Sequence, residues 1–165
     1  MQSGSAGLVL LALANCGQKA ALPPIDPAYG FTVLSPSQQT VIHAVASAML
    51  VDAFSPAQER AGALAATVRG VDVAVSRLPL GTQAEFGQLL QLLENPLTRW
   101  LTTGIGSWSD AGDARVAAFL DRWRYSRFTL LRSGYDALHQ LVMAAWYAQP
   151  AAWTVIRYPG PPHIA

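Results

Sequence analysis

The sequence is short of charged residues and of cysteine. Only 13% of its 165 residues are charged, against about a quarter in ordinary soluble domains, which indicates surface suited to a partner or a membrane. The net charge is +1 and no basic run occurs, so the sequence gives no electrostatic support for nucleic-acid binding. A single cysteine excludes an internal disulfide framework and a cysteine-rich metal site.

Motifs of catalysis and of cofactor binding are also missing. No Gly-x-Ser-x-Gly elbow occurs, and the glycine pair at 104–106 lacks the preceding strand, third glycine and downstream acid of a dinucleotide fingerprint. The three histidines have no paired spacing, whereas a metal site needs several converging ligands. His139 and Met143 lie four residues apart and could face a haem, but no Cys-x-x-Cys-His attachment motif accompanies them. The sequence therefore predicts a chain without a catalytic centre of its own.

Lysine is nearly absent, and arginine makes up ten of the eleven basic residues. The planar guanidinium of arginine pairs in bidentate fashion with carboxylates and stacks on aromatic rings, so arginine is favoured at interfaces. A GC-rich genome would give the same bias. Composition alone leaves both explanations open.

The first sixteen residues resemble the leader of an exported lipoprotein. The apolar run 6–14 has the length of a signal-peptide core and is too short to cross a bilayer, which takes about 20 residues. Leu13–Cys16 resembles a lipoprotein box, although Asn15 stands where Gly or Ala is usual and no Lys or Arg precedes the run. We expect residues 1–15 to be a signal-like segment and Cys16 to be a lipidation site that attaches a periplasmic protein to the membrane. A buried free cysteine on an N-terminal helix is the alternative.

Closely spaced prolines and a glycine follow this cysteine. Pro23, Pro24, Pro27 and Gly30 leave no room for a helix. Residues 16–34 are therefore expected to form a tether, or an extended arm laid over a surface.

Residues 35–150 carry the pattern of a helical domain. Ser35 and Ser55 are each followed by proline and then by glutamine at the capping-box position, which indicates two helix starts. The Thr82–Glu85 pair indicates a third start. Leu78-Pro79 is expected to end the helix before it.

Apolar residues between these signals recur at steps of three and four, the period of an amphipathic helix. The last helix is expected to hold Phe128 and Leu130 on its inward stripe and to end at Pro150. Segment 102–112 is rich in Gly, Ser and Thr and is expected to be a loop. The best strand candidate, residues 154–158, is isolated. The sequence predicts an all-α fold, an irregular bundle of about five helices with extended N-terminal and C-terminal arms.

A block of arginines and aromatic residues lies at positions 121–127. Three arginines stand beside a tryptophan and a tyrosine there, and these residue types are enriched at interface hot spots. The alternative is a core Trp123 with solvated arginines around it. The proline-rich exit 158–162 cannot pack as regular structure by itself, so residues 151–165 are expected to form a C-terminal arm that lies on a partner.

From Phe119 onward the sequence resembles the small, non-catalytic subunit of exported flavin dehydrogenases of the glucose-methanol-choline (GMC) type, described as the gluconate 2-dehydrogenase subunit 3-like family. The resemblance spans roughly residues 34–162, and the first three helices match in pattern more than in residues. The residues that carry it are the arginine-tryptophan block, Trp146-Tyr147, Trp153 and the Tyr-Pro-Gly-Pro-Pro exit. The twin-arginine leader that the family often carries is not visible here.

The resemblance implies an accessory subunit that stabilises an FAD-dependent GMC-type large subunit and assists its export to the periplasm. It implies that this chain binds no cofactor, that FAD lies in the partner, and that electrons pass to a membrane-bound or c-type cytochrome. Two other functions stay open: a free-standing periplasmic lipoprotein that binds a small apolar ligand, and a cytoplasmic regulator or adaptor. The residues expected to bind the partner are Arg122, Trp123, Arg124, Arg127, Trp146, Tyr147, Trp153, Tyr158, Pro159 and Pro161.

Overall fold

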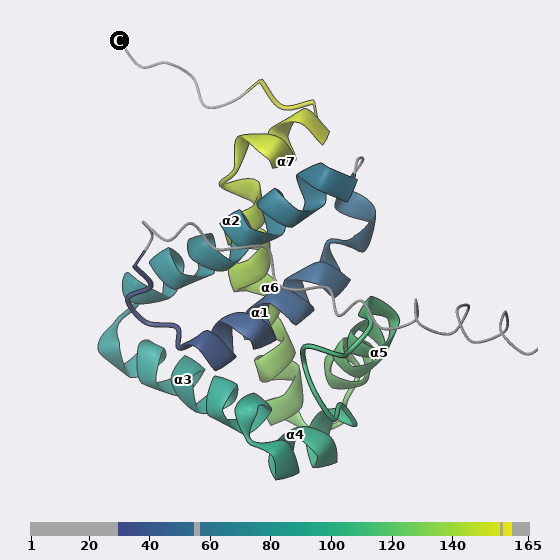
Figure 1. Ribbon diagram of the computed structural model, residues 1–165. Helices are drawn as coiled ribbons and strands as arrows, with labels where there is room; N and C mark the ends of the chain where they lie inside the picture. The colour runs from purple at the N-terminus through teal and green to yellow at the C-terminus, as the bar shows by residue number, and fades with distance from the viewer. Residues whose placement is uncertain (1–29, 55–56, 156, 160–165) are drawn as a thin grey trace, which may run out of the picture.

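Helices account for all the regular structure in the described part of the chain, and no strand occurs there. The computed structural model describes residues 30–54, 57–155 and 157–159. The predicted all-α fold is confirmed, with more helices than the five expected (Figure 1). The elements are α1 (Pro36–Met49), the 3-10 helix η1 (Val51–Ala53), α2 (Ala57–Ser76), α3 (Leu80–Glu94), α4 (Pro96–Thr103), α5 (Asp113–Arg124), α6 (Thr129–Tyr147) and α7 (Pro150–Val155).

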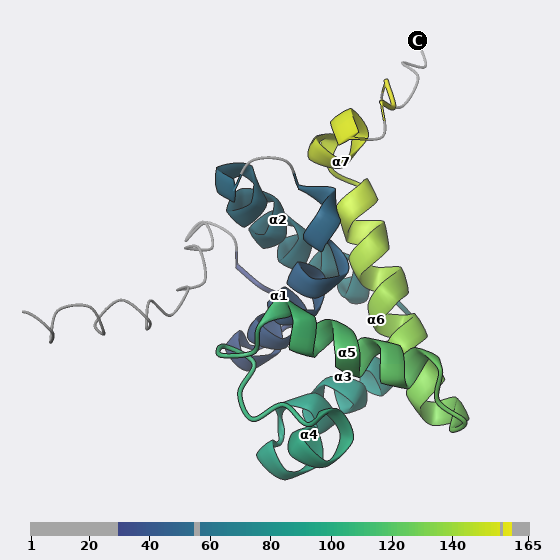
Figure 2. The ribbon, with the colours of Figure 1, turned by 90° about the vertical axis from the view of Figure 1, so that its right-hand side faces the viewer.

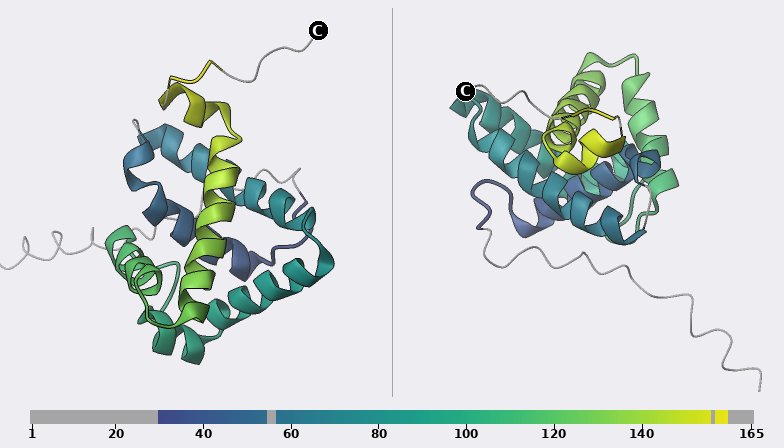
Figure 3. Two further views of the ribbon diagram at one scale, coloured as in Figure 1. Left: turned by 180° about the vertical axis from the view of Figure 1, so that it is seen from behind. Right: turned by 90° about the horizontal axis from the view of Figure 1, so that it is seen from above.

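Helix α6 connects the two ends of the molecule. It packs against α1, α2 and α5, and Figure 3 (left) shows it running down the middle of one face. Helix α7 lies at its C-terminal end, whereas α4 and the α5–α6 connection lie at its start (Figure 2). A helix of 19 residues is about 28 Å long, so these two ends are separate surfaces.

The core is formed by apolar residues from α1, α2, α3, α5 and α6. In the part of the core beside α5, aromatic rings pack on one another. Phe119 packs edge-to-face on Trp108, with ring centroids 5.7 Å apart, and on Trp123, with ring centroids 5.3 Å apart. The indole nitrogen of Trp108 donates to the carbonyl of Leu93 at 2.8 Å. This hydrogen bond ties the loop between α4 and α5 to the end of α3.

Two glycines let α6 approach its neighbours closely. A Cβ atom at Gly134 on α6 would lie 2.7 Å from Cζ3 of Trp123 on α5. A Cβ atom at Gly70 on α2 would lie 2.9 Å from Cβ of Ala145 on α6. Carbon atoms do not pack at such distances, so glycine is required at both positions for α5 and α2 to sit where they do.

Asp72 on α2 holds the extended segment that leads into α1. Its carboxylate accepts hydrogen bonds from the backbone nitrogens of Thr32, Val33 and Leu34 at 3.0, 3.0 and 2.8 Å, and from the Thr32 hydroxyl at 3.0 Å. Burial alone raises the pKa of Asp72, but these hydrogen bonds outweigh it and hold the pKa below its ordinary value. The contact fixes the direction in which the chain enters α1. Residues 30–34 belong to the predicted arm 16–34, whose other residues lie outside the described part.

The helix start predicted at Ser35 is confirmed, and the one predicted at Thr82 is wrong. The Ser35 side chain accepts from the nitrogen of Gln38 at 3.3 Å, and the Gln38 side chain accepts from the nitrogen of Ser35 at 3.1 Å. Helix α3 instead begins at Leu80, directly after Pro79, so Thr82 lies inside its first turn. Pro79 occupies the N-cap position, and no side chain makes a capping hydrogen bond there. Ser55 lies outside the described residues.

Helix boundaries toward the C-terminus also differ from expectation. Helix α4 runs into the predicted loop as far as Thr103 and ends at Gly104, whose φ of 73° is the left-handed conformation that glycine adopts readily. Pro150 begins α7 rather than ending α6, because a first-turn residue does not need its N–H group. Segment 154–158, the best strand candidate, forms no strand among its described residues, since Thr154 and Val155 are helical. The C-terminal arm predicted from residue 151 starts inside α7.

Replacing Asp72 with asparagine tests its hold on the N-terminal segment. The amide cannot accept all the hydrogen bonds of the carboxylate, so we expect Asp72→Asn to lower the free energy of unfolding by about 2–4 kcal/mol at neutral pH. The difference in stability between wild type and variant is complete above the pKa of an aspartate in the unfolded chain, about 4. It is lost as the pH falls through the lower pKa of Asp72 in the folded protein. Urea unfolding of both proteins across this pH range measures it. Equal midpoints at pH 7 would contradict the role assigned to Asp72.

Replacing Gly134 with alanine tests the close approach of α5 and α6. The added methyl group meets the Trp123 ring, so we expect Gly134→Ala to destabilise the fold by about 1–3 kcal/mol, despite the better helix propensity of alanine. Gly62→Ala on α2 is the matched control, because a Cβ atom there meets nothing within 4 Å. Thermal unfolding should show a gain or no change for Gly62→Ala. A gain for Gly134→Ala as well would refute the steric constraint.

Candidate functional site

Helix α4 turns its apolar side outward. Leu97, Trp100 and Leu101 are 73%, 63% and 74% exposed. They recur at steps of three and four, a spacing that normally marks the buried side of a helix. Helix α4 is therefore inverted relative to an ordinary surface helix. The apolar period in the sequence identifies this face, but it does not give the direction in which the face points.

The inner side of α4 carries polar side chains that donate hydrogen bonds to nearby backbone carbonyls. Arg99 donates through Nε to the carbonyl of Ile105 at 3.2 Å and through Nη1 to the carbonyl of Glu94 at 3.2 Å. Thr98 donates to the carbonyl of Leu92 at 2.6 Å. These carbonyls lie at the end of α3 and in the loop after α4, where no helical partner satisfies them. Turning α4 over would leave them unpaired, so its orientation is fixed.

Trp123 and Arg122 hold the C-terminal end of α4. Trp123 is 2% exposed, and its indole nitrogen donates to the carbonyl of Thr102 at 3.2 Å. The guanidinium of Arg122 donates to the carbonyl of Thr103. Trp123 was expected to bind a partner, but the structure places it in the core. This agrees with the alternative interpretation of segment 121–127, in which Trp123 is a core residue. Arg122 is exposed, yet its side chain is already engaged within the chain.

The connection from α5 to α6 continues this exposed surface. Tyr125, Phe128 and Leu130 are all exposed, so the inward positions expected for Phe128 and Leu130 are wrong. The first turn of α6 lies at one end of the molecule (Figure 2), and Thr129 and Leu130 are exposed there. The guanidinium of Arg124 lies 5.3 Å from the ring centre of Tyr125, and that of Arg127 lies 4.9 Å from the ring centre of Phe128.

These two regions adjoin where Arg122 and Trp123 contact the end of α4, and together we call them the α4 end. Segments 96–104 and 122–131 contain four arginines and no acid. No ion pair with an acid occurs for Arg124 or Arg127 among the residues that the structure describes. The α4 end thus combines apolar side chains with unpaired positive charge. Its members are Leu97, Trp100, Leu101, Arg124, Tyr125, Arg127, Phe128 and Leu130.

A second aromatic group lies at the opposite end of α6. The carbonyl of Tyr147 accepts a hydrogen bond from the Trp153 indole at 2.8 Å, and the nitrogen of Tyr158 donates to the carbonyl of Trp153 at 2.8 Å. The Trp153 and Tyr158 rings meet edge-to-face with centroids 5.9 Å apart. Tyr147 and Tyr158 are about half exposed. We call these three residues the aromatic latch. Trp146 is buried instead, with its ring 5.1 Å from that of Phe54.

The residues expected to bind a partner therefore do not form one site. The first four, Arg122, Trp123, Arg124 and Arg127, lie at the end of α5 and in the α5–α6 connection, whereas the aromatic latch lies around the end of α6, in α7 and just after α7. Pro159 is exposed next to the latch. Pro161 and Cys16 lie outside the described residues. Sequence reasoning missed the three large apolar residues that α4 exposes, which enlarge the first group.

A polar cluster that the sequence did not indicate joins α1, α2 and α5. Ser47 donates to Asp113 at 2.6 Å, and Arg60 contacts the other oxygen of this carboxylate at 2.5 Å. Arg60 also donates to the Ser47 hydroxyl at 2.9 Å. In this cluster the serine donates to a carboxylate and not to a histidine, so the arrangement ties three helices together and does not form an activated nucleophile.

His43 lies one turn before Ser47 on α1, with its Nε2 atom buried and without a hydrogen-bond partner in the described part of the chain. Burial lowers the pKa of His43, Asp113 acts in the opposite direction, and Arg60 lowers it further. The net result is a pKa below the ordinary value. The folded protein therefore favours the neutral imidazole.

The described residues contain no group of three or more potential metal ligands. None of their helices has the length and hydropathy needed to cross a bilayer. Comparison of the chain with family models, curated proteins and solved structures found no match.

We expect the stability of the protein to fall in mild acid because of His43. The unfolded chain binds a proton to this histidine near pH 6.5, whereas the folded chain binds it only at lower pH, so stability is complete above pH 6.5 and decreases below it. His43→Leu should flatten this decrease between pH 7 and 5. Urea unfolding at several pH values, with an NMR titration of the His43 ring, provides the measurement. An unchanged slope in the variant would assign the pH dependence to other groups.

Proposed function

We propose that this protein is the non-catalytic small subunit of an exported, FAD-dependent dehydrogenase of the GMC type. In this role it stabilises the flavin-containing subunit and assists its export. The observation that carries the proposal is the aromatic latch: the part of the sequence with the sharpest family resemblance presents Tyr147 and Tyr158 on the surface, with Trp153 half-buried between them. Aromatic side chains of this kind supply much of the binding energy at protein interfaces.

The latch is ordered by contacts within the chain before any partner binds. The indole nitrogen and the backbone carbonyl of Trp153 are both engaged, because the nitrogen donates to the carbonyl of Tyr147 and the carbonyl accepts from the nitrogen of Tyr158. A side chain that is already fixed loses little conformational entropy on binding, which favours affinity. The tyrosine rings can cover apolar surface while their hydroxyls reach polar groups at the edge of a contact.

The division of labour in such a complex follows from the resemblance. FAD and the catalytic residues belong to the large subunit, this chain binds no cofactor, and electrons leave to a membrane-bound or c-type cytochrome. The complex is periplasmic, and a lipidated Cys16 provides an attachment to the membrane. The substrate, an alcohol or a sugar, is selected by the large subunit.

Changes in the aromatic latch should release the flavin subunit. We expect Trp153→Ala, and separately a chain that ends at Val155, to weaken the complex roughly 30-fold or more, because a central tryptophan contributes at least 2 kcal/mol to many interfaces. Affinity purification from the native host, with mass spectrometry and a flavin absorbance scan, measures the amount of partner retained.

Trp100→Ala is the matched control, because it removes an exposed tryptophan at the other end of α6. It should retain the yellow partner. Circular dichroism and thermal unfolding check that each variant is folded. An undiminished complex in both latch variants, or a colourless monomer from the wild-type protein, would refute the proposal.

A further inference from the structure

We propose that the α4 end docks on the surface of an anionic lipid bilayer. This inference goes beyond the proposed function and does not depend on the flavin partner. It is carried by the exposed apolar face of α4, by its continuation into the α5–α6 connection and by the positive charge around both.

The exposed apolar residues belong to two segments that lie at the same end of the molecule. Leu97, Trp100 and Leu101 lie on one side of α4, and Phe128 and Leu130 lie on the neighbouring connection. Figures 1 and 2 show both regions at the same end of the ribbon. Leucine and phenylalanine side chains enter the acyl boundary, whereas tryptophan favours the interface between headgroups and hydrocarbon.

The charge of this end is complementary to an anionic surface. Segments 96–104 and 122–131 hold four of the eleven basic residues and none of the ten acids, so the remainder of the chain carries more acids than bases. Such an asymmetry orients the protein with the α4 end toward negative charge. Arg124 and Arg127 lie over the rings of Tyr125 and Phe128, which places the guanidinium groups beside the apolar tips.

A bilayer provides both kinds of contact at the depths that this surface needs. Phosphate groups lie at the level of the arginines, and hydrocarbon lies directly beneath them. A protein partner would need an apolar hollow for Trp100 and carboxylates placed at Arg124 and Arg127.

Tryptophan fluorescence can test this orientation directly. Trp108, Trp123 and Trp146 are buried, so quenching by brominated acyl chains reports mainly on Trp100 and Trp153. The full chain is mixed with vesicles of phosphatidylcholine alone, or of phosphatidylcholine with phosphatidylglycerol. We expect quenching only with the anionic vesicles. Trp100→Phe should bind these vesicles equally well and lose the quenching, whereas Trp153→Phe should retain it.

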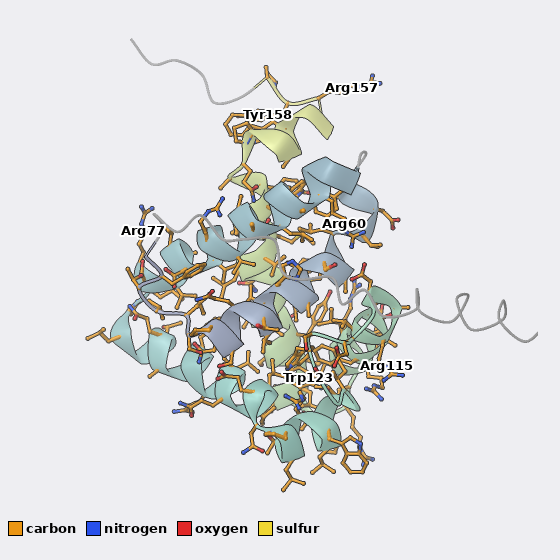
Figure 4. The ribbon with its side chains drawn as sticks, in the orientation of Figure 1. Arg60, Arg77, Arg115, Trp123, Arg157 and Tyr158 are labelled. Atoms are coloured by element: carbon orange, nitrogen blue, oxygen red, sulfur yellow. The ribbon has the colours of Figure 1, made fainter. Side chains whose placement is uncertain are left out.

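The contribution of charge is tested with the double variant Arg124→Gln, Arg127→Gln. Each arginine near an anionic surface contributes about fivefold to partitioning, so we expect a loss of roughly 25-fold in vesicle co-sedimentation. Arg77→Gln is the matched control, because Arg77 is exposed on a distant part of the molecule (Figure 4). It should bind like the wild type. Binding of the wild type should also weaken as salt concentration rises.

Three results would overturn the membrane proposal. The first is equal quenching by neutral and anionic vesicles, and the second is quenching that Trp100→Phe leaves unchanged. The third is release of the flavin partner by the double arginine variant with no vesicle binding by the wild type, which would identify the α4 end as a protein contact. Because the vesicle assay contains no partner, its outcome is independent of whether the chain belongs to a dehydrogenase complex.

Discussion

The contact between Trp123 and Gly134 determines how α5 and α6 are arranged against each other. The indole ring occupies the space that any side chain at position 134 would fill, and a Cβ atom there would also come within 3.3 Å of Leu89 on α3. The same ring donates a hydrogen bond to Thr102 at the end of α4. One side chain on α5 thus contacts both α4 and α6, and Leu89 brings α3 close to the same glycine. Because the core is tightly packed, a shift of one of these helices would disturb the others.

The exposed surfaces follow from this constraint and from the need to satisfy backbone carbonyls. Arg99 and Thr98 face inward to reach these carbonyls, so the leucines and the tryptophan of the helix face outward. Helix α6 then separates the α4 end from the aromatic latch by its own length. The flavin subunit and the bilayer that we propose would therefore contact separate surfaces and would not compete for space.

The sequence predicts the fold class well because its signals are local. The capping box at Ser35 and the apolar period of α5 specify helices through contacts between near neighbours in the chain. The sequence predicts the surfaces poorly. Trp123 and Trp146 have the residue type of interface hot spots but lie in the core, and Trp100 has the spacing of a core residue but lies outside. Inside and outside depend on contacts between distant segments, such as Trp123 with Gly134, which periodicity does not encode.

The hydrogen bonds to Asp72 have a mechanical consequence. They join the segment just before α1 to a helix some forty residues further along the chain. A pulling force that enters through the N-terminal side of the protein would therefore pass from Thr32 and Leu34 directly into α2, and α1 would carry little of it. Three neighbouring backbone nitrogens donate to the same carboxylate, so these hydrogen bonds would have to break together. The fold therefore has its point of mechanical attachment at Asp72, one turn before the end of α2.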